Sequence, residues 1–329
     1  MRILVGDIGG TKTALAIAAP DAGGGLVLHH PERYPSAEHA GLESIVRHYL
    51  ATHAVSCSGA AFAIAGPVSG RRSQVTNLTW QIDADALERA LGLSRVLLLN
   101  DLEAVAWGIA ALAPEDVCEL QPGEPGAVGN RCVIAAGTGL GEAGLFWDGH
   151  RHHPFATEGG HAEFAATDAR EWALREFLRR RHARVSWERL VSGMGISALH
   201  AFCCEYAGGR SPQPVLEPAA VAVGAREGDA RCVETMALFF RLYGREAGDL
   251  ALKQMALGGV YLGGGIAPRN LEALRASAFL DGFLDKGRMR GLMTRMPVRV
   301  ILQPQVALLG AARAWQDDQS PGRPVVVAG

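Results

Sequence analysis

Residues 2–12 read Arg2-Ile3-Leu4-Val5-Gly6-Asp7-Ile8-Gly9-Gly10-Thr11-Lys12, and this stretch decides the fold. A short apolar run ends at a Gly-Gly bend, and a second apolar run follows from Thr13 to Ala19. Two such runs on either side of a glycine bend are typical of a β-hairpin. The Asp7 carboxylate and the Thr11 hydroxyl stand beside the bend, so the hairpin carries groups suited to an anion and its cation.

The same strand–turn–strand pattern occurs again later in the chain. A predicted strand, Cys132 to Ala136, runs into the turn Gly137-Thr138-Gly139, and a second strand, Ala143 to Trp147, follows. A third glycine turn, Gly263-Gly264-Gly265, closes another apolar run. Glycine lets backbone N–H groups approach phosphate oxygens closely. A single Gly-Gly turn is more often a plain hairpin, but three such turns with an acid beside the first indicate phosphate binding.

Two common nucleotide-binding plans are excluded by the motifs. The sequence contains no G-x-x-x-x-G-K-[ST] run, so the chain is not a P-loop protein. No G-x-G-x-x-G opens a helix after the first strand, which argues against a Rossmann dehydrogenase.

The bulk composition is that of an ordinary globular protein. The chain has 329 residues, 48% of them hydrophobic, and a net charge of −2. The length favours two domains. There is no long block of one charge and no apolar run of about 20 residues, so we expect neither a nucleic-acid partner nor a membrane span. Asp7 interrupts the early apolar run, so no secretory signal is visible and we expect a cytoplasmic protein. The six cysteines form no C-x-x-C pair, and the adjacent Cys203 and Cys204 are expected to be buried, reduced thiols.

Strand and helix patterns alternate along the chain, which predicts an α/β fold. The segment 112–130 is rich in proline, glycine and acid and is interpreted as a linker between two lobes. A single helix is expected over Trp187–Tyr206, and His152-His153 is expected in a surface loop before Pro154.

The motifs together resemble those of the actin/hexokinase-like kinases, and closely those of the bacterial glucokinase family. The resemblance starts with the three glycine turns and extends over almost the whole chain. Its further matches are Thr76-Asn77-Leu78-Thr79-Trp80, Asn100-Asp101, Glu158-Gly159-Gly160-His161, Glu188-Arg189-Leu190-Val191-Ser192-Gly193, Pro268-Arg269, Asp285-Lys286-Gly287-Arg288 and Leu308-Leu309-Gly310. One departure is Ala135-Ala136 before the second turn, where the family commonly has a proline.

The resemblance implies a two-lobed actin/hexokinase-like (ribonuclease H-like) fold with a cleft between the lobes. Residues 1–112 and a C-terminal helix at about 302–318 would form the small lobe, and residues 113–301 the large lobe. The implied activity is the ATP-dependent phosphorylation of D-glucose at its 6-hydroxyl, the entry step of glycolysis, with ATP and Mg²⁺ required. A homodimer is a further expectation from the family.

Asn100-Asp101 follows the predicted strand Val96–Leu99, and ligands of α/β sheets gather at the carboxyl ends of strands. The resemblance implies that Asp101 accepts the proton of the sugar 6-hydroxyl, a role that carboxylates fill in kinases. The alternative is that Asp101 only caps the helix that follows.

By resemblance, Asn100, Asp101, Glu158, His161 and Glu188 bind the sugar. Carboxylates accept hydrogen bonds and histidine either donates or accepts, so this set can read hydroxyl stereochemistry. For His161 the alternatives are a metal site or a surface histidine. The metal site is disfavoured because the zinc-type C-x-C-G cluster of a related repressor/kinase family is missing.

The nucleotide is expected at the three turns. By resemblance its ligands are Asp7, Gly9, Gly10, Thr11, Lys12, Gly137, Thr138, Gly139, Gly264 and Gly265, with Asp7 holding Mg²⁺ through water. Rival functions are a kinase for another hexose or an amino sugar, a non-catalytic sugar-binding relative, and an actin-like or chaperone ATPase.

Overall fold

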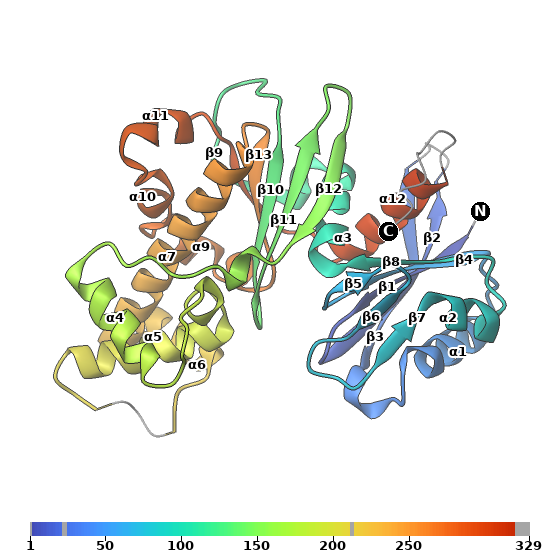
Figure 1. The fold of residues 1–329 in the computed structure, drawn as a ribbon, viewed down its shortest axis with the longest axis horizontal. Helices are drawn as coiled ribbons and strands as arrows, with labels where there is room; N and C mark the ends of the chain where they lie inside the picture. Colours follow the sequence, from blue (N-terminus) through green and yellow to red (C-terminus); the bar gives the residue numbers. More distant parts are fainter. Residues whose placement is uncertain (1, 22–24, 211–213, 320–329) are drawn as a thin grey trace. The chain divides into compact units, whose positions relative to one another are not determined.

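The protein is described by a computed structural model that covers residues 2–21, 25–210 and 214–319. The chain divides into two compact units (Figure 1). Unit 1 combines Met1–Asp116 with the described part of Gln303–Gly329, and unit 2 is Val117–Leu302. Unit 1 is therefore built from two separate stretches of chain, and unit 2 from one.

The elements of unit 1 alternate between strands and helices. They are β1 (Ile3–Ile8), β2 (Lys12–Pro20), β3 (Leu26–Pro35), η1 (Ser36–Glu38), α1 (Leu42–His53), β4 (Gly59–Ile64), β5 (Val68–Ser69), β6 (Arg72–Gln74), β7 (Gln81–Asp83), α2 (Ala84–Leu91), β8 (Val96–Asn100), α3 (Asp101–Gly108), η2 (Ile109–Ala111), η3 (Pro114–Asp116) and α12 (Val306–Asp318).

A sheet with strand order β3-β2-β1-β4-β8 forms the middle of unit 1. Neighbouring side chains of a strand point to opposite faces, so β1 buries Leu4 and Ile8 on one face and Ile3 and Val5 on the other. The first face packs against α1 and α2, and the second against α3 and α12. Strands β5, β6 and β7 form a separate small sheet.

The C-terminal helix α12 packs closely on α3. A Cβ at Gly310 would collide with the carbonyl oxygen of Ala104, so glycine allows the two backbones to approach. Trp315 on the same helix fills the space over Gly59 of β4. The last helix of the chain is thus part of the layer that supports the β8–α3 junction.

Unit 2 is larger and more helical. Its elements are β9 (Val117–Gln121), β10 (Arg131–Ala136), β11 (Leu140–Trp147), β12 (His152–Thr157), η4 (Gly159–His161), α4 (Ala169–Arg179), η5 (Trp187–Arg189), α5 (Gly193–Tyr206), α6 (Pro218–Arg226), α7 (Ala230–Gln254), β13 (Gly259–Gly263), α8 (Ile266–Arg269), α9 (Leu271–Arg275), α10 (Phe279–Leu284), η6 (Gly287–Met289), α11 (Arg290–Met293) and β14 (Val298–Ile301).

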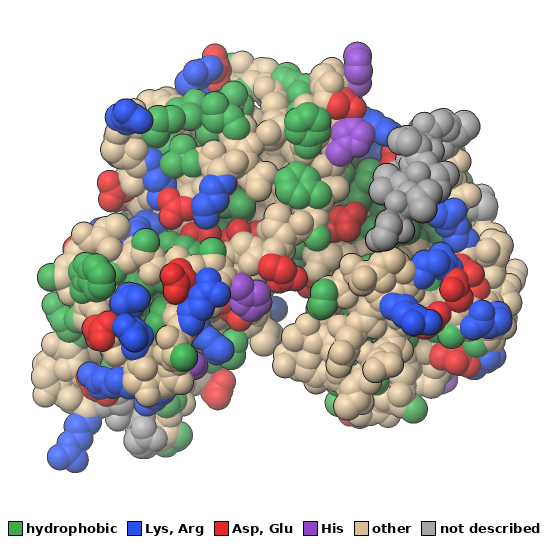
Figure 2. Space-filling model, in the orientation of Figure 1, with side chains coloured by type: hydrophobic (Ala, Val, Ile, Leu, Met, Phe, Trp, Pro, Cys, Tyr) green, Lys and Arg blue, Asp and Glu red, His purple; other side chains and the backbone are tan. Residues whose placement is uncertain are grey.

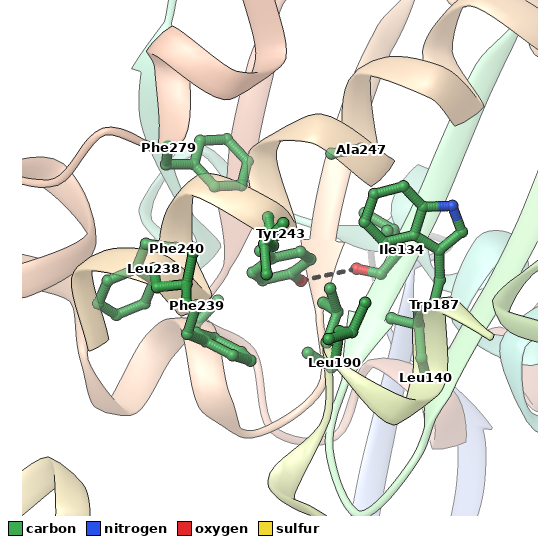
Figure 3. Packing of buried hydrophobic residues seen from close by; sticks show 14 of the residues in the cluster. Ile134, Leu140, Trp187, Leu190, Leu238, Phe239, Phe240, Tyr243, Ala247 and Phe279 are labelled. Carbon is green, nitrogen blue, oxygen red and sulfur yellow. Dashed lines mark hydrogen bonds between the residues drawn. The ribbon is translucent and has the colours of Figure 1, made fainter. Parts of the chain in front are cut away.

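The sheet of unit 2 has the order β12-β11-β10-β13-β14-β9, and helix α7 crosses its core. Figure 3 shows the aromatic side chains of α7 between the sheet and α10. The Tyr243 hydroxyl donates a hydrogen bond of 3.1 Å to the carbonyl oxygen of Ile134. This bond ties the buried helix to β10, the strand that leads into the second glycine turn.

The surface mixes charges of both signs. On the face drawn in Figure 2, Lys and Arg side chains lie among Asp and Glu side chains. All six cysteines are free thiols. Within the described ranges, no helix has the length and apolar character needed to span a membrane.

Three details of the sequence interpretation are wrong. The segment 112–130 contains β9, which pairs antiparallel with β14, so it is not merely a linker. His152 and His153 belong to β12, which pairs with β11, and not to a loop. The expected helix Trp187–Tyr206 is broken because Ser192 caps α5 with a hydrogen bond from the Gly195 N–H. The predicted α/β class and both glycine-turn hairpins are confirmed.

Candidate active site

The first glycine turn joins β1 to β2 and is held by its own backbone. The Gly9 N–H donates to the Lys12 carbonyl oxygen at 3.0 Å, and the Ser36 hydroxyl donates to the Gly9 carbonyl oxygen at 2.7 Å. A Cβ at Gly10 would lie 2.6 Å from the Thr76 carbonyl oxygen. The run that begins at Thr76 therefore packs directly on this turn, which requires glycine there.

Asp7 lies near the end of β1, and Thr11 and Lys12 are exposed at the turn. Burial raises the pKa of Asp7 to about 6, and the nearby positive charge of Arg33 partly opposes this rise. A half-buried carboxylate at such a position is stabilised as an anion when a cation binds. One carboxylate with the hydroxyl of Thr11 beside it is a donor set that fits Mg²⁺ held through water and phosphate.

Asn100 and Asp101 lie at the junction of β8 and α3. The Asn100 side-chain oxygen accepts hydrogen bonds from the N–H groups of Leu102 (3.0 Å) and Glu103 (3.3 Å). Its amide group donates to the Gly66 carbonyl oxygen at 3.3 Å. Asn100 is therefore the N-cap of α3, and Asp101 is the first helical residue. The N-cap position therefore belongs to Asn100, and the Asp101 carboxylate also accepts a hydrogen bond of 2.9 Å from the Leu102 N–H.

These two parts of unit 1 share one edge of the sheet. Ile8, Ile64 and Asn100 are aligned across the parallel strands β1, β4 and β8. Adjacent strands are about 4.8 Å apart, so the end of β8 lies roughly 10 Å from the end of β1. The first glycine turn and Asp101 thus belong to the same edge.

The second glycine turn joins β10 to β11, and Glu188 braces it. The Glu188 carboxylate accepts a hydrogen bond of 3.2 Å from the Leu140 N–H. A Cβ at Gly139 would collide with the same carboxylate, so glycine makes room for it. The Gly193 N–H at the start of α5 donates to the Gly137 carbonyl oxygen at 2.8 Å. Thr138 lies between these two fixed glycines.

Glu188 also reaches the loop Glu158–His161. The His161 Nδ1 lies 4.0 Å from a Glu188 oxygen, and its Nε2 lies 3.9 Å from a Glu158 oxygen. The side chains of Glu158 and His161 are 67% and 60% exposed, whereas that of Glu188 is 19% exposed. The three residues form a polar cluster with two accessible members and a more buried one that is anchored to the second turn.

The third glycine turn rests on the second. Gly264 has a φ of +74°, and a Cβ there would collide with the Ala136 carbonyl oxygen at the end of β10. Only glycine combines this conformation with this contact. The turn at Gly264-Gly265 therefore lies at the same edge of the unit 2 sheet as Gly137–Gly139, and α8 begins directly after it.

A cavity of about 590 Å³ opens beside the third turn. Its walls come from α6, from α7 and from the segment 268–277 that follows the turn. Apolar side chains such as Met236 and Phe240 line it together with the polar Asn270 and Arg226. This volume suits a small organic ligand. Of the lining residues, the sequence interpretation had named only Pro268-Arg269, as a match to the family, and it assigned them no role.

A pair of buried acids under the loop Glu158–His161 was also missed. Glu142 on β11 and Glu246 on α7 are 2% and 0% exposed, and both Glu246 carboxyl oxygens and Oε1 of Glu142 lack a hydrogen-bond partner among the described residues. A Cβ at Gly159 would collide with the Glu142 carboxylate. Burial and the Glu142 carboxylate raise the pKa of Glu246 to about 10, so Glu246 is protonated at neutral pH. Alternation along β11 could have indicated that Glu142 faces the core.

The structure thus collects the predicted residues into one set in each unit. Unit 1 carries Asp7, the first turn and Asn100-Asp101, and unit 2 carries the other two turns with Glu158, His161 and Glu188.

Comparison with known proteins shows which protein family has a similar sequence and structure. The glucokinase family model matches residues 4–318. A curated glucokinase from Nostoc punctiforme is 40% identical over 332 residues, which cover 94% of this chain and 97% of the relative. The crystal structure of a glucokinase from an Antarctic psychrotroph superposes with a TM-score of 0.86 at 32% identity, covering 96% of this chain and 99% of that one.

A more distant likeness supports the fold. A ROK family glucokinase from Streptomyces griseus, solved in complex with glucose and AMPPNP, has a TM-score of 0.65 at 21% identity and covers 95% of this chain and 99% of that one. The expected actin/hexokinase-like fold is confirmed by these neighbours. The match over nearly the whole chain, with relatives of this similarity, shows that the chain belongs to the glucokinase family.

Proposed function

We propose that this chain phosphorylates D-glucose at its 6-hydroxyl with ATP, and that Asp101 is the general base of the reaction. One observation carries the proposal more than any other. The Glu188 carboxylate binds the backbone of the second glycine turn and also lies 4.0 Å from His161. A group that reads sugar hydroxyls is therefore attached to a turn suited to phosphate, as a sugar kinase requires.

Asn100 fills the N-cap position of α3, and Asp101 follows it at the carboxyl end of β8 with a carboxylate oriented by the Leu102 N–H, so we assign Asp101 as the base. A sugar hydroxyl becomes a good nucleophile when a carboxylate takes its proton during attack on phosphorus. Asn100 would fix the backbone from which Asp101 projects. Its amide and carbonyl groups are both engaged by the protein, so we assign it a positioning role in addition to the expected sugar contact.

Glu158, His161 and Glu188 would bind the sugar hydroxyls around C1 to C3. Two carboxylates and an imidazole offer both acceptors and a donor. The exposed pair Glu158 and His161 would contact the sugar, and Glu188 would hold His161 in place. Loss of either partner would leave a polar group unpaired in the complex, which is the basis of discrimination between epimers.

The first and second turns would bind the ATP phosphates through Gly9, Gly10, Thr11, Lys12, Gly137, Thr138 and Gly139. Asp7 would hold Mg²⁺, which neutralises phosphate charge when it is bound. Gly264 and Gly265 would lead the adenosine into the cavity lined by α6, α7 and segment 268–277. Because ATP is a cytoplasmic substrate, we propose the cytoplasm as the location. We also carry forward the homodimer as a prediction for sedimentation analysis.

A coupled assay of ADP release tests the function. We expect turnover with ATP, Mg²⁺ and glucose, and much lower kcat/KM with mannose, fructose and N-acetylglucosamine. A preference for one of the other sugars would reassign the substrate and leave the kinase activity. The absence of sugar-dependent ADP release with all four would overturn the proposal.

A further inference from the structure

Three potential metal ligands meet in unit 2 at a distance from every residue discussed above as a sugar or phosphate ligand. They are His200 on α5, Asp229 at the N-cap of α7 and Cys232 in the first turn of α7. One ligand atom from each lies within 4.8 Å of the other two. Helices α5, α6 and α7 pack against one another here (Figure 1).

Two of the three residues are buried and one is exposed, as in a metal site that an ion can enter from solvent. His200 is 4% exposed and Cys232 is 3% exposed, whereas Asp229 is exposed and leaves a path for an ion to enter. A Cβ at Gly224 on α6 would lie 2.8 Å from the Cys232 sulfur, so glycine makes room for the thiol. The cluster is therefore enclosed by three helices and open on one side.

A helix cap alone does not account for the cluster. Asp229 does cap α7, since its carboxylate accepts hydrogen bonds from the N–H groups of Arg231 and Cys232. Cys232 could be a small buried hydrophobe. Neither role explains His200, whose Nδ1 is buried and has no hydrogen-bond partner among the described residues. A buried nitrogen of this kind normally has a partner, and its absence points to a ligand.

We propose that His200, Asp229 and Cys232 bind a divalent transition-metal ion of the zinc class. Imidazole, carboxylate and thiolate are the ligand types that zinc takes. Tetrahedral ligand atoms with zinc bonds of about 2.0–2.3 Å are about 3.3–3.8 Å apart, so side-chain movements of about 1 Å would close the site. Water would take the fourth position on the side of Asp229. The two anionic ligands balance the charge of the ion, and the Cys232 proton passes to solvent on binding.

The ion would join the C-terminal half of α5 to the corner between α6 and α7. The N-terminus of α5 holds the second glycine turn through Gly193, and Val233, next to Cys232, lines the cavity. The metal would therefore stiffen the helices around the proposed nucleotide site without contacting the substrates.

Cobalt titration of the full, tag-free chain tests the site. The protein is treated with a chelator, kept reduced with a phosphine, exchanged into buffer and titrated with Co²⁺. We expect one equivalent to give the visible bands of a tetrahedral site with a thiolate-to-cobalt absorption, Zn²⁺ to displace the cobalt, and one equivalent of Zn²⁺ to raise Tm.

Matched variants separate the metal site from the helix cap. Asp229→Asn keeps an N-cap of almost equal quality but removes the charged ligand. We expect Asp229→Asn and Cys232→Ser each to weaken cobalt binding at least tenfold, and Cys57→Ser in unit 1 to leave it unchanged. Melting curves of the metal-free variants check that they are folded.

The outcomes divide cleanly. Loss of the cobalt bands in Asp229→Asn and Cys232→Ser, with both variants folded, supports the site. No thiolate-to-cobalt band in the parent chain, or a band that persists in both variants, overturns it.

Discussion

The two hairpins that carry the first and second glycine turns differ in where they place an acid. The sheet orders β3-β2-β1-β4-β8 and β12-β11-β10-β13-β14 match strand for strand, with β9 added in unit 2. In unit 1 the third residue of the second strand, Ala14, is paired with Asp7. In unit 2 the third residue of the second strand is Glu142, paired with Ile134. The acid of unit 2 therefore lies on the second strand of its hairpin and one cross-strand pair further from the turn than Asp7.

The environments of the two acids also differ. Burial raises the pKa of Asp7 only to about 6, so at neutral pH it is an anion that can hold a cation. Burial raises the pKa of Glu142 as well, and it lies beside the protonated Glu246. One scaffold therefore supports a charged acid at one turn and a buried acid pair, with Glu246 protonated, at the other. The acid that serves the second turn, Glu188, comes from outside its sheet.

The largest effect is expected on kcat, from a variant at the end of β8 in unit 1. The equivalent strand of unit 2 is β14. Asp101 follows β8, whereas β14 is followed by Leu302, so only unit 1 offers a base there. Asp101→Asn keeps the size of the side chain but cannot accept a proton, and kcat should fall by roughly 10²–10⁴. KM for glucose and Tm should change little, because Asn100 supplies the cap. A kcat close to that of the parent chain would show that Asp101 is structural. Asn100→Asp, which keeps a good capping residue, is the matched control for Tm.

The next effect tests the charged acid of the first hairpin. Asp7→Asn removes a ligand that would act on Mg²⁺ through water, and such partners typically contribute roughly 10–100-fold in affinity or activity. We expect the Mg²⁺ concentration at half-maximal rate to rise within that range, with KM for glucose unchanged. Kinetics over a Mg²⁺ series measures this. An unchanged Mg²⁺ dependence would remove Asp7 from the metal site.

A smaller effect tests the polar cluster of unit 2. Glu158→Ala and His161→Ala each delete a hydrogen bond to the sugar, which in an exposed cluster amounts to roughly tenfold in glucose affinity. The preference for glucose over mannose should fall in both variants. Isothermal titration with both sugars provides the measurement. Arg184→Ala is a control, since Arg184 pairs with Glu163 near the same loop but is not in the cluster. Unaltered affinity and preference in both variants would contradict the assignment.

The last prediction tests the buried acid pair through stability. The pKa of Glu246 is about 10 in the folded protein and near 4.5 in the unfolded chain, so unfolding releases a proton between these values. The free energy of unfolding should therefore decrease as pH rises from about 5 to about 10. Lys253 favours the ionised form and Asp249 opposes it, but burial dominates.

Urea unfolding at pH 6, 7.5 and 9 measures this dependence. Glu246→Gln should be less sensitive to pH than the parent chain, because glutamine carries no proton to release. Glu272→Gln, at a side chain that is 88% exposed, is the control. Equal pH dependence of the parent chain and Glu246→Gln would show that the pair is not protonated.

The sequence predicted what depends on local pattern. Glycine turns between apolar runs predicted both hairpins. The apolar run that ends before Asn100-Asp101 predicted that these two residues follow a strand, which is β8 in the structure. Contacts between distant segments were not predictable in this way. Nothing local indicates that Glu246 meets Glu142, or that His200 meets Cys232, because long-range packing brings them together. Similarly, β9 is a short run among prolines and glycines and becomes a strand only because β14 offers it an edge.

The return of α12 to unit 1 has a consequence for the protein during its synthesis. Residues up to Asp116 leave the ribosome first, but α12, which covers one face of their sheet together with α3, is made only after all of Val117–Leu302. At about 5–20 residues per second this delay is roughly 10–40 seconds. Unit 2 is continuous and can complete its core during that time, whereas the nascent unit 1 exposes apolar residues of β1 and β4. Chain termination shortly before Val306 would leave that face permanently uncovered, so nascent unit 1 is the part of the chain most in need of a chaperone.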